Sequence, residues 1–196
     1  MTHPLRSVAV FCGSRAGTDP AHAAAARALG AGLARQGVRL VYGGGGVGLM
    51  GEVAKAALAA GGEVHGVIPD FLLHAERPPP SGMTALEVVP SMHARKTRMF
   101  ELSDGFVALS GGLGTLDEMV EILTWRQLGL HDKPVVAVDT NGWAQPFLAL
   151  VEDMIRQGFV SEGGRRLFQV AATVDEALAL LRAAPLPDSA APAARL

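Results

Sequence analysis

Glu118 follows a glycine-rich segment and is the side chain in this sequence best placed to do chemistry. The segment reads Ser110-Gly111-Gly112-Leu113-Gly114-Thr115-Leu116-Asp117-Glu118. It comes after the apolar run 106–109, and from Thr115 its apolar residues recur at helical spacing, which predicts a strand, a glycine turn and a helix. Because glycines let the backbone approach a ligand and the first amides of a helix lack intrahelical partners, the turn is suited to bind an anion such as phosphate.

Two roles for Glu118 remain open at this level. Thr115-Leu116-Asp117-Glu118 fits the capping box, in which Thr115 caps the amide three residues on and Glu118 returns the bond. In the second role, the carboxylate faces a part of the ligand that becomes positive, since it would repel a phosphate. A ribosyl carbon that develops oxocarbenium character is such a part.

Two cations lie on the wrong side of a helix for ordinary solvated charges. This helix is expected to start after Pro90, with Ser91 as its N-cap. At about 100° per residue, its apolar arc is formed by Met92, Met99, Phe100 and Leu102. Arg95 and Lys96 fall inside this arc. They therefore either point at an anion or lie along the edge of the core.

The two segments resemble the signatures of one enzyme family. Residues 110–118 are similar to the PGGxGTxxE motif, and Met92-His93-Ala94-Arg95-Lys96 is similar to the MHxRK motif, of the LONELY GUY (LOG) family. These enzymes are phosphoribohydrolases of cytokinin riboside 5'-monophosphates, once mislabelled as lysine decarboxylases. The similarity extends from Val10 to about Phe159, through VFCGS, LVYGGGGVGLMG, GVIP, TWRQLG and HDKPV. Ser110 replaces the proline of the motif, which is expected to loosen the turn without removing a contact.

The resemblance implies an activity and a set of site residues. It implies an N-glycosidase that releases free base and ribose 5-phosphate from adenine-type nucleoside 5'-monophosphates, including N6-substituted cytokinin forms, without a cofactor or metal. Arg95 and Glu118 are the implied catalytic residues. Residues expected to bind substrate are Glu76, Lys96, Gly111, Gly112, Leu113, Gly114, Thr115, Leu116, Asp117 and Thr124. Glu76 lies in an LxxxE-like stretch, and Thr124 is either in the base pocket or on the helix surface. The family also implies a homodimer.

A second glycine turn, residues 43–51, follows the strand expected at 38–42. Gly46, Gly48 and Gly51 satisfy GxGxxG, and Asp70 lies near the place of a ribose-binding acid, so an NAD-dependent oxidoreductase is one alternative. The fingerprint, however, sits on the second expected strand rather than the first. Aligning the two turns instead predicts that they wall one nucleotide site together, with Gly44 and Gly45 contributing to it. Glu52 then matches Glu118 in position and is interpreted as structural.

Strands and helices alternate along the whole sequence, which predicts an α/β fold with one doubly wound, mostly parallel sheet and helices on both faces, of Rossmann-like type. Strands are expected at 8–12, 38–42, 64–68, 86–89, 106–109, 133–139 and 167–170. The helices outside the two motifs are expected at 19–36, after the second glycine turn to about 60, at 143–157 and at 173–182. Residues 1–184 are expected to form a single nucleotide-binding domain, and 185–196 a disordered Pro/Ala-rich tail.

Composition excludes several classes of protein. The net charge of −2 gives no reason to expect nucleic acid or an anionic membrane as a partner. Cys12 is the one cysteine, so no internal disulfide forms, and it is interpreted as a buried, inert thiol. No run approaches the about 18 apolar residues of a membrane span, and a cytoplasmic location is expected. The histidines show no metal-ligand spacing. A non-catalytic nucleotide or cofactor carrier on the same fold is the competing function.

Overall fold

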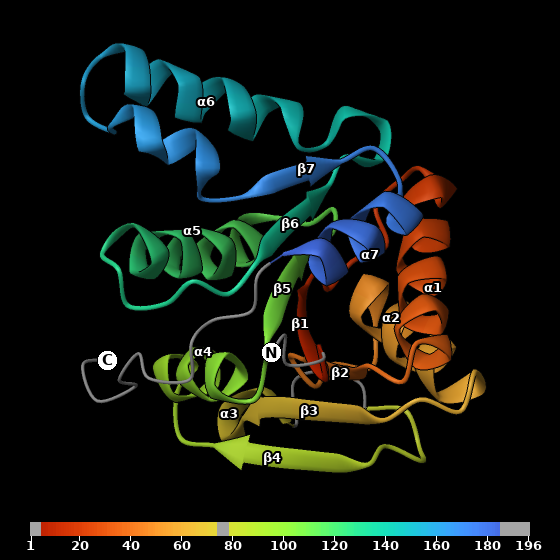
Figure 1. The fold of residues 1–196 in the computed structure, drawn as a ribbon. Coiled ribbons are helices and arrows are strands. Elements are labelled where there is room, and N and C mark those ends of the chain that lie inside the picture. Colours follow the sequence, from red (N-terminus) through yellow and green to blue (C-terminus); the bar gives the residue numbers. More distant parts are fainter. Residues whose placement is uncertain (1–4, 74–78, 185–196) are drawn as a thin grey trace.

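The computed structural model describes residues 5–73 and 79–184, which form one seven-stranded parallel sheet between two layers of helices (Figure 1). The strands are β1 (Ser7–Phe11), β2 (Arg39–Tyr42), β3 (Val64–Pro69), β4 (Ala85–Val89), β5 (Gly105–Ala108), β6 (Val135–Val138) and β7 (Gln169–Ala171). The α-helices are α1 (Pro20–Arg35), α2 (Gly48–Ala59), α3 (Asp70–Leu73), α4 (Met92–Glu101), α5 (Leu113–Gln127), α6 (Gln145–Arg156) and α7 (Val174–Ala183). Two 3₁₀ turns, η1 (Thr140–Gly142) and η2 (Glu162–Arg166), complete the elements. The predicted α/β fold is confirmed.

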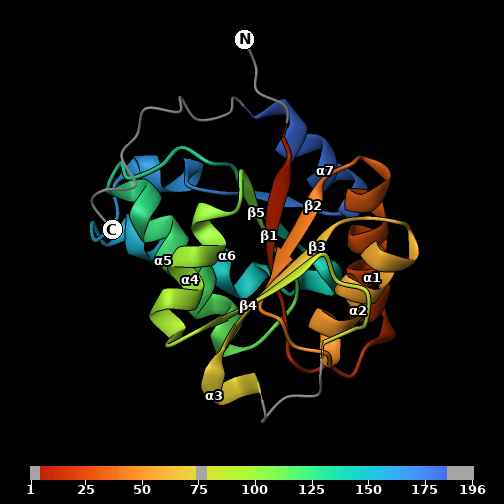
Figure 2. The same cartoon turned by 90° about the horizontal axis from the view of Figure 1, so that it is seen from below.

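The strand order places a reversal in the middle of the sheet. The order is β4-β3-β2-β1-β5-β6-β7, so the chain runs outward from β1 in one direction and from β5 in the other. In open α/β sheets ligands bind beyond the carboxyl ends of the strands at such a switch point. A binding site is therefore expected beyond the carboxyl ends of β1 and β5. Figure 2 shows these two strands side by side in a view from below.

The core is divided by the sheet into two halves, because successive side chains of a strand point to opposite faces. In β1, Val8 and Val10 pack with residues of α1, α2 and α7, whereas Ala9 and Phe11 pack with residues of α4, α5 and α6. The same two groups of helices lie on opposite sides of the sheet in Figure 1. All five residues of β1 are buried, as expected for a parallel sheet that is covered on both faces.

Local capping explains where several helices begin. Ser91 accepts a hydrogen bond from the amide of Ala94 at the start of α4, as predicted, and Asp19 caps α1 through the amide of Ala21. The helix expected at 143–157 instead begins at Gln145, because η1 precedes it and Asp139 accepts the amide of Ala144.

Two further expectations need correction or lie outside the described residues. The last strand lies at Gln169–Ala171, after η2, and so begins later than the expected 167–170, and the short helix α3 follows β3 directly. Glu76 and the tail 185–196 lie outside the described residues, and the division at residue 184 stays a prediction. Within 5–73 and 79–184, none of the helices is long and apolar enough to cross a membrane.

Candidate active site

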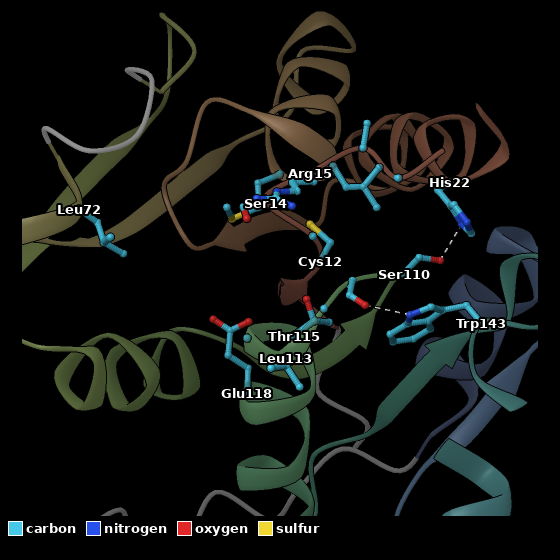
Figure 3. Close-up of a pocket in the computed structure, with 18 of the residues that line it drawn as sticks. Cys12, Ser14, Arg15, His22, Leu72, Ser110, Leu113, Thr115, Glu118 and Trp143 are labelled. Carbon is cyan, nitrogen blue, oxygen red and sulfur yellow. Dashed lines mark hydrogen bonds between the residues drawn. The ribbon is translucent and has the colours of Figure 1, made fainter. Parts of the chain in front are cut away.

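A cavity of about 660 Å³ opens at the carboxyl ends of β1 and β5, at the switch point of the sheet (Figure 3). Its walls come from the loop after β1, the glycine loop after β5, Trp143, and residues of α1, α2, α3, α4 and α5. The polar or charged residues lining it are Cys12, Ser14, Arg15, His22, Arg95, Ser110, Thr115, Glu118 and Trp143. The predicted glycine segment thus meets Arg95 and Glu118 in one place.

The start of α5 offers unpaired backbone donors to this cavity. Gly112 is the N-cap and makes no side-chain cap, and the first amide bonded within the turn is that of Leu116, which donates to the carbonyl of Gly112. In the described part of the chain, no acceptor faces the amides of Leu113, Gly114 and Thr115. Together with the positive end of the helix dipole, these amides are suited to bind an anion.

The glycines of this loop serve two different purposes. A Cβ on Gly111 would lie 2.1 Å from Oγ1 of Thr115, so this glycine makes room for the threonine side chain. A Cβ on Gly112 or Gly114 would meet no protein atom within 4 Å. The space beside these two residues is therefore left open for a ligand.

Glu118 reaches across the cavity floor to α4 instead of capping its own helix. Nη2 of Arg95 donates a hydrogen bond to Oε1 of Glu118, and both residues are buried, with 8% and 5% of their surfaces exposed. Thr115 is the third residue of α5 rather than its N-cap. The capping-box interpretation of Thr115 and Glu118 is therefore wrong, and the interpretation of Arg95 as an inward-pointing cation is confirmed.

Burial and the neighbouring cation act on Glu118 in opposite directions. Burial raises the pKa of the Glu118 carboxyl, Arg95 lowers it through its charge and hydrogen bond, and the balance leaves this pKa above its ordinary value. A buried carboxylate with a raised pKa and one fixed partner is the kind of group that serves as a general base. Nε of Arg95 is buried without a hydrogen-bond partner in the described residues.

Residues 43–48 of the second glycine turn lie behind the site, and only Leu49 and Met50, in the first turn of α2, line the cavity. A Cβ on Gly43 would lie 3.4 Å from Cζ of Arg95, so this residue packs against the guanidinium. Gly44 has a φ of +79°, and a Cβ there would lie 2.8 Å from Cβ of Ile68. Neither Gly44 nor Gly45 is among the residues around the cavity. The structure therefore places these two predicted binding residues outside the cavity.

The helix that follows the GxGxxG segment has first-turn amides that are already hydrogen-bonded within the protein, so they are not available to a dinucleotide. The amides of Leu49 and Met50 in the first turn of α2 donate to the carbonyl of Gly13, at 2.9 and 3.3 Å. A Cβ on Gly48 would lie 2.3 Å from the carbonyl carbon of Ser14, which shows that this glycine serves close packing of two loops. The site required by the oxidoreductase alternative is thus filled by the protein's own backbone.

The wall opposite α5 is the loop after β1, which sequence reasoning missed. The amide of Gly13 donates to the carbonyl of Ser110 at 3.0 Å and joins this loop to the glycine loop. Arg15 lines the cavity from the same loop, is exposed, and has no ion-pair partner among residues 5–73 and 79–184. The signal was present in the segment VFCGS, but only the strand order shows that β1 rather than β2 adjoins β5.

Two more cavity residues were also missed, His22 and Trp143. Nδ1 of His22 lies 2.8 Å from Oγ of Ser110, and Nε1 of Trp143 donates to the carbonyl of Gly111 at 3.0 Å (Figure 3). Both come from segments far from the two motifs in sequence. Replacement of the motif's proline by Ser110 is expected only to loosen the turn. In the structure Ser110 also gains a hydrogen bond with His22.

The remaining predicted residues lie outside the cavity. Lys96 pairs with Asp117 and Glu121, each at 3.1 Å, and joins α4 to α5. Thr124 is exposed and donates to the carbonyl of Val120, which agrees with its helix-surface interpretation. Leu116 is partly buried on the outer side of α5, and it lines a shallow surface groove with Asp117 rather than the cavity.

Two neighbouring groups play no chemical part in this arrangement. Glu52 forms an ion pair with Arg27 on the surface, as expected for a structural residue. Cys12 is buried, and burial raises the pKa of its thiol, which opposes formation of a nucleophilic thiolate. No group of three or more His, Cys, Asp or Glu side chains suited to a metal ion occurs in the described ranges.

Sequence comparison identifies relatives along most of the chain. The family model described as "Possible lysine decarboxylase" matches residues 50–181. The chain is 43% identical to the cytokinin riboside 5'-monophosphate phosphoribohydrolase of Rhodococcoides fascians over 177 residues, 90% of this chain and 89% of that protein. It is 42% identical to the rice (Oryza sativa subsp. japonica) enzyme LOG, with 88% of this chain and 71% of that one covered.

Solved structures agree on the fold. The molybdenum cofactor carrier protein of Chlamydomonas reinhardtii superposes with a TM-score of 0.67 at 27% identity, covering 89% of this chain and 94% of that one. TM1055 also gives a TM-score of 0.67, at 24% identity, with 90% and 98% covered. Given the two motifs that meet in one cavity and the relatives matched over nine tenths of the sequence, the chain belongs to the LOG family of cytokinin riboside 5'-monophosphate phosphoribohydrolases.

Proposed function

We propose that this protein hydrolyses the N-glycosidic bond of adenine-type nucleoside 5'-monophosphates, including N6-substituted cytokinin riboside monophosphates, to free base and ribose 5-phosphate. One observation carries the proposal. The buried pair of Glu118 and Arg95 lies in the same cavity as the unpaired amides that begin α5. A carboxylate and an anion site in one cavity suit a substrate that carries a phosphate at one end and develops positive charge on its ribose during the reaction.

The phosphate binds at the start of α5. The amides of residues 112–115 and the hydroxyl of Thr115 donate to its oxygens, and the open space beside Gly112 and Gly114 lets it approach the backbone. Arg15 faces this position from the loop after β1 and adds a charge-assisted contact. Anchoring the phosphate holds the ribose over Glu118, and positioning of this kind supplies a large part of the rate enhancement.

Glu118 acts on the anomeric carbon and on the attacking water. Its ionised carboxylate stabilises the oxocarbenium-like transition state as the bond to the base breaks, and it accepts a proton from water as the new C–O bond forms. The bonding electrons leave with the base, which takes up a proton. A positioned general base contributes roughly 10²- to 10⁴-fold. Arg95 favours the ionised form of Glu118 and holds it in place.

The older name of the family does not fit this cavity. A pyridoxal-dependent decarboxylase holds its cofactor through a lysine Schiff base. No lysine is among the described residues that line the cavity, and Lys96 is turned toward Asp117 and Glu121 instead. Amino-acid decarboxylation therefore finds no support in the residues of this site.

A non-catalytic carrier is the second candidate, and the cofactor carrier from Chlamydomonas with the same fold is the observation in its favour. The two functions separate in one experiment. The protein is incubated with AMP and with an N6-substituted AMP, and free base is measured by chromatography. Base release by the wild type, lost in Glu118→Gln while AMP still binds, supports the hydrolase. Binding of AMP without base release by the wild type contradicts it.

A homodimer is a further part of the proposal. Leu113 and Val120 of α5 and Leu128, its C-cap, are all exposed, with 86% of Leu113 open to solvent. Apolar side chains along one helix face next to a site are typical of an interface. Light scattering should give twice the monomer mass for the wild type and the monomer mass for Val120→Glu. A monomeric wild type would contradict the dimer.

A cytoplasmic location stays a prediction from the sequence.

A further inference from the structure

Ser110 and His22 form a polar pair at the end of the cavity that lies away from Glu118. Oγ of Ser110 lies 2.8 Å from Nδ1 of His22, and Ser110 is buried. Both residues line the cavity. The LOG motif has a proline in place of Ser110, and a proline side chain makes no such bond, so the pair is a property of this chain rather than of the motif.

The loop after β1 holds the imidazole from its other side. Gly17 has a φ of +76°, and a Cβ there would lie 3.2 Å from Cδ2 of His22. A side chain at this position would therefore press on the ring. His22 lies in the first turn of α1, where its side chain could adopt more than one rotamer. The contact with Gly17 and the hydrogen bond to Ser110 together select one orientation of the ring.

The second ring nitrogen of His22 is left for a ligand. Nε2 has no hydrogen-bond partner in the described part of the chain. The nearby carboxylate of Asp19 does not occupy it, because its two oxygens accept from the amide of Ala21 and from Nδ2 of Asn141. When the hydroxyl of Ser110 donates to Nδ1, Nε2 carries the proton and is a donor.

The position of the pair identifies which part of a nucleotide it meets. Ser110 directly precedes the glycine turn that begins α5, and Figure 3 shows Glu118 and His22 on opposite sides of Thr115. A nucleotide with its phosphate at this helix start and its ribose toward Glu118 therefore has His22 at its phosphate end. Arg15 lines the same cavity from the loop after β1.

We infer that His22 is a phosphate-contacting residue, oriented by Ser110, which strengthens the grip on a 5'-phosphate and so sets the preference for nucleotides over nucleosides. The inference rests on the proposed function in one respect, the placement of the phosphate at the start of α5. Ser110 acts through His22 and is a positioning residue. Neither residue takes part in breaking the glycosidic bond, so the contribution belongs to binding.

Three variants separate the two ring nitrogens. His22→Asn places a polar atom near Nδ1 and none near Nε2, whereas His22→Gln reaches the position of Nε2. We expect His22→Asn to raise KM for AMP and Kd for ribose 5-phosphate about tenfold, the typical effect of one lost charge-assisted hydrogen bond, with kcat within about twofold. His22→Gln should recover part of the affinity, and Ser110→Ala should lose about threefold. The control is His65→Gln, which changes a β3 histidine paired with Glu87 of β4, and it should match the wild type.

Calorimetric titration with ribose 5-phosphate keeps this test independent of catalysis. If the wild type releases no base but binds ribose 5-phosphate, the proposed function fails, and a weaker Kd in His22→Asn still supports the inference. An unchanged Kd in His22→Asn overturns it, and so does a fall in kcat at unchanged KM. Equal losses of affinity for ribose 5-phosphate and for adenine would show a general distortion of the site and also overturn it.

Discussion

Glu118 in α5 and Arg95 in α4 form a hydrogen-bonded ion pair that is buried on both sides and faces the cavity at the switch point of the sheet. The pair joins two helices that belong to the two sequence motifs. It places a carboxyl group that lines the cavity in the second turn of the helix whose start we propose as the phosphate site.

Replacing Glu118 by glutamine should abolish turnover and keep binding. Glutamine preserves shape and one hydrogen bond to Arg95 but cannot accept a proton from water or stabilise a cation. We expect kcat for AMP to fall roughly 10²- to 10⁴-fold, with Kd for AMP changed by less than about threefold. Base release and calorimetry measure the two. Glu52→Gln, the matched residue in α2 with a surface ion pair, should show wild-type kcat, and a wild-type kcat in Glu118→Gln would refute the assignment.

Replacing Arg95 by methionine should destabilise the protein, because it leaves Glu118 buried without its partner. Loss of one member of a buried pair costs on the order of 3–5 kcal/mol. Urea unfolding at pH 7 measures this as a lower midpoint. The double variant Arg95→Met/Glu118→Leu should recover much of the loss, since no buried charge remains. Equal stability of Arg95→Met and the double variant would show that the cost arises from packing and not from charge.

Glycine-to-alanine changes in the loop should separate folding from phosphate binding. Gly111→Ala puts a Cβ 2.1 Å from Oγ1 of Thr115 and should lower the melting temperature. Gly114→Ala meets no protein atom within 4 Å and lies in the first turn of α5, so stability should be kept or raised by up to about 1 kcal/mol. Its methyl group occupies the phosphate space, and KM for AMP should rise. An unchanged KM in Gly114→Ala would place the phosphate elsewhere.

Lys133 should make the protein more stable as the pH rises above about 8. Its ammonium donates to the carbonyl of Phe100 and lies over the ring of that residue, while burial lowers its pKa to about 8 from 10.5. Between these two values the unfolded chain binds more protons than the folded one, so the free energy of unfolding rises with pH. Below about pH 8 Lys133 is charged in both states, and the full free-energy cost of burying its ammonium opposes folding.

The measurement is urea unfolding at pH 7.5 and pH 10 for the wild type, Lys133→Met and Lys55→Met. Between pH 7.5 and pH 10 the unfolding free energy of the wild type should rise relative to that of Lys133→Met. Lys55 is exposed on α2, and its replacement should leave the pH dependence of the wild type intact. Parallel pH dependence of the wild type and Lys133→Met would contradict the lowered pKa.

Features that depend on local periodicity could be predicted from the sequence. The strand and helix order, the Ser91 cap and the inward position of Arg95 each follow from spacing along one element, and each is confirmed. The capping box at Thr115 failed because a buried guanidinium from another element competes for the same carboxylate, and spacing within α5 carries no information about α4.

Features that depend on strand order could not be predicted. The second glycine turn looked like a neighbour of the first because both follow strands, but β1 lies between β2 and β5. The loop with Arg15 therefore takes the place assigned to Gly44 and Gly45. His22 and Trp143 reach the cavity from distant segments, and nothing in their own surroundings in the sequence marks them.

The backbone of Gly13 connects three segments, since its amide donates to the carbonyl of Ser110 and its carbonyl accepts from the amides of Leu49 and Met50. A displacement of any one of these segments must be passed to the other two. Efforts to reshape the cavity should therefore begin at lining side chains outside this junction, such as Leu72 and Met92, and leave the junction itself untouched.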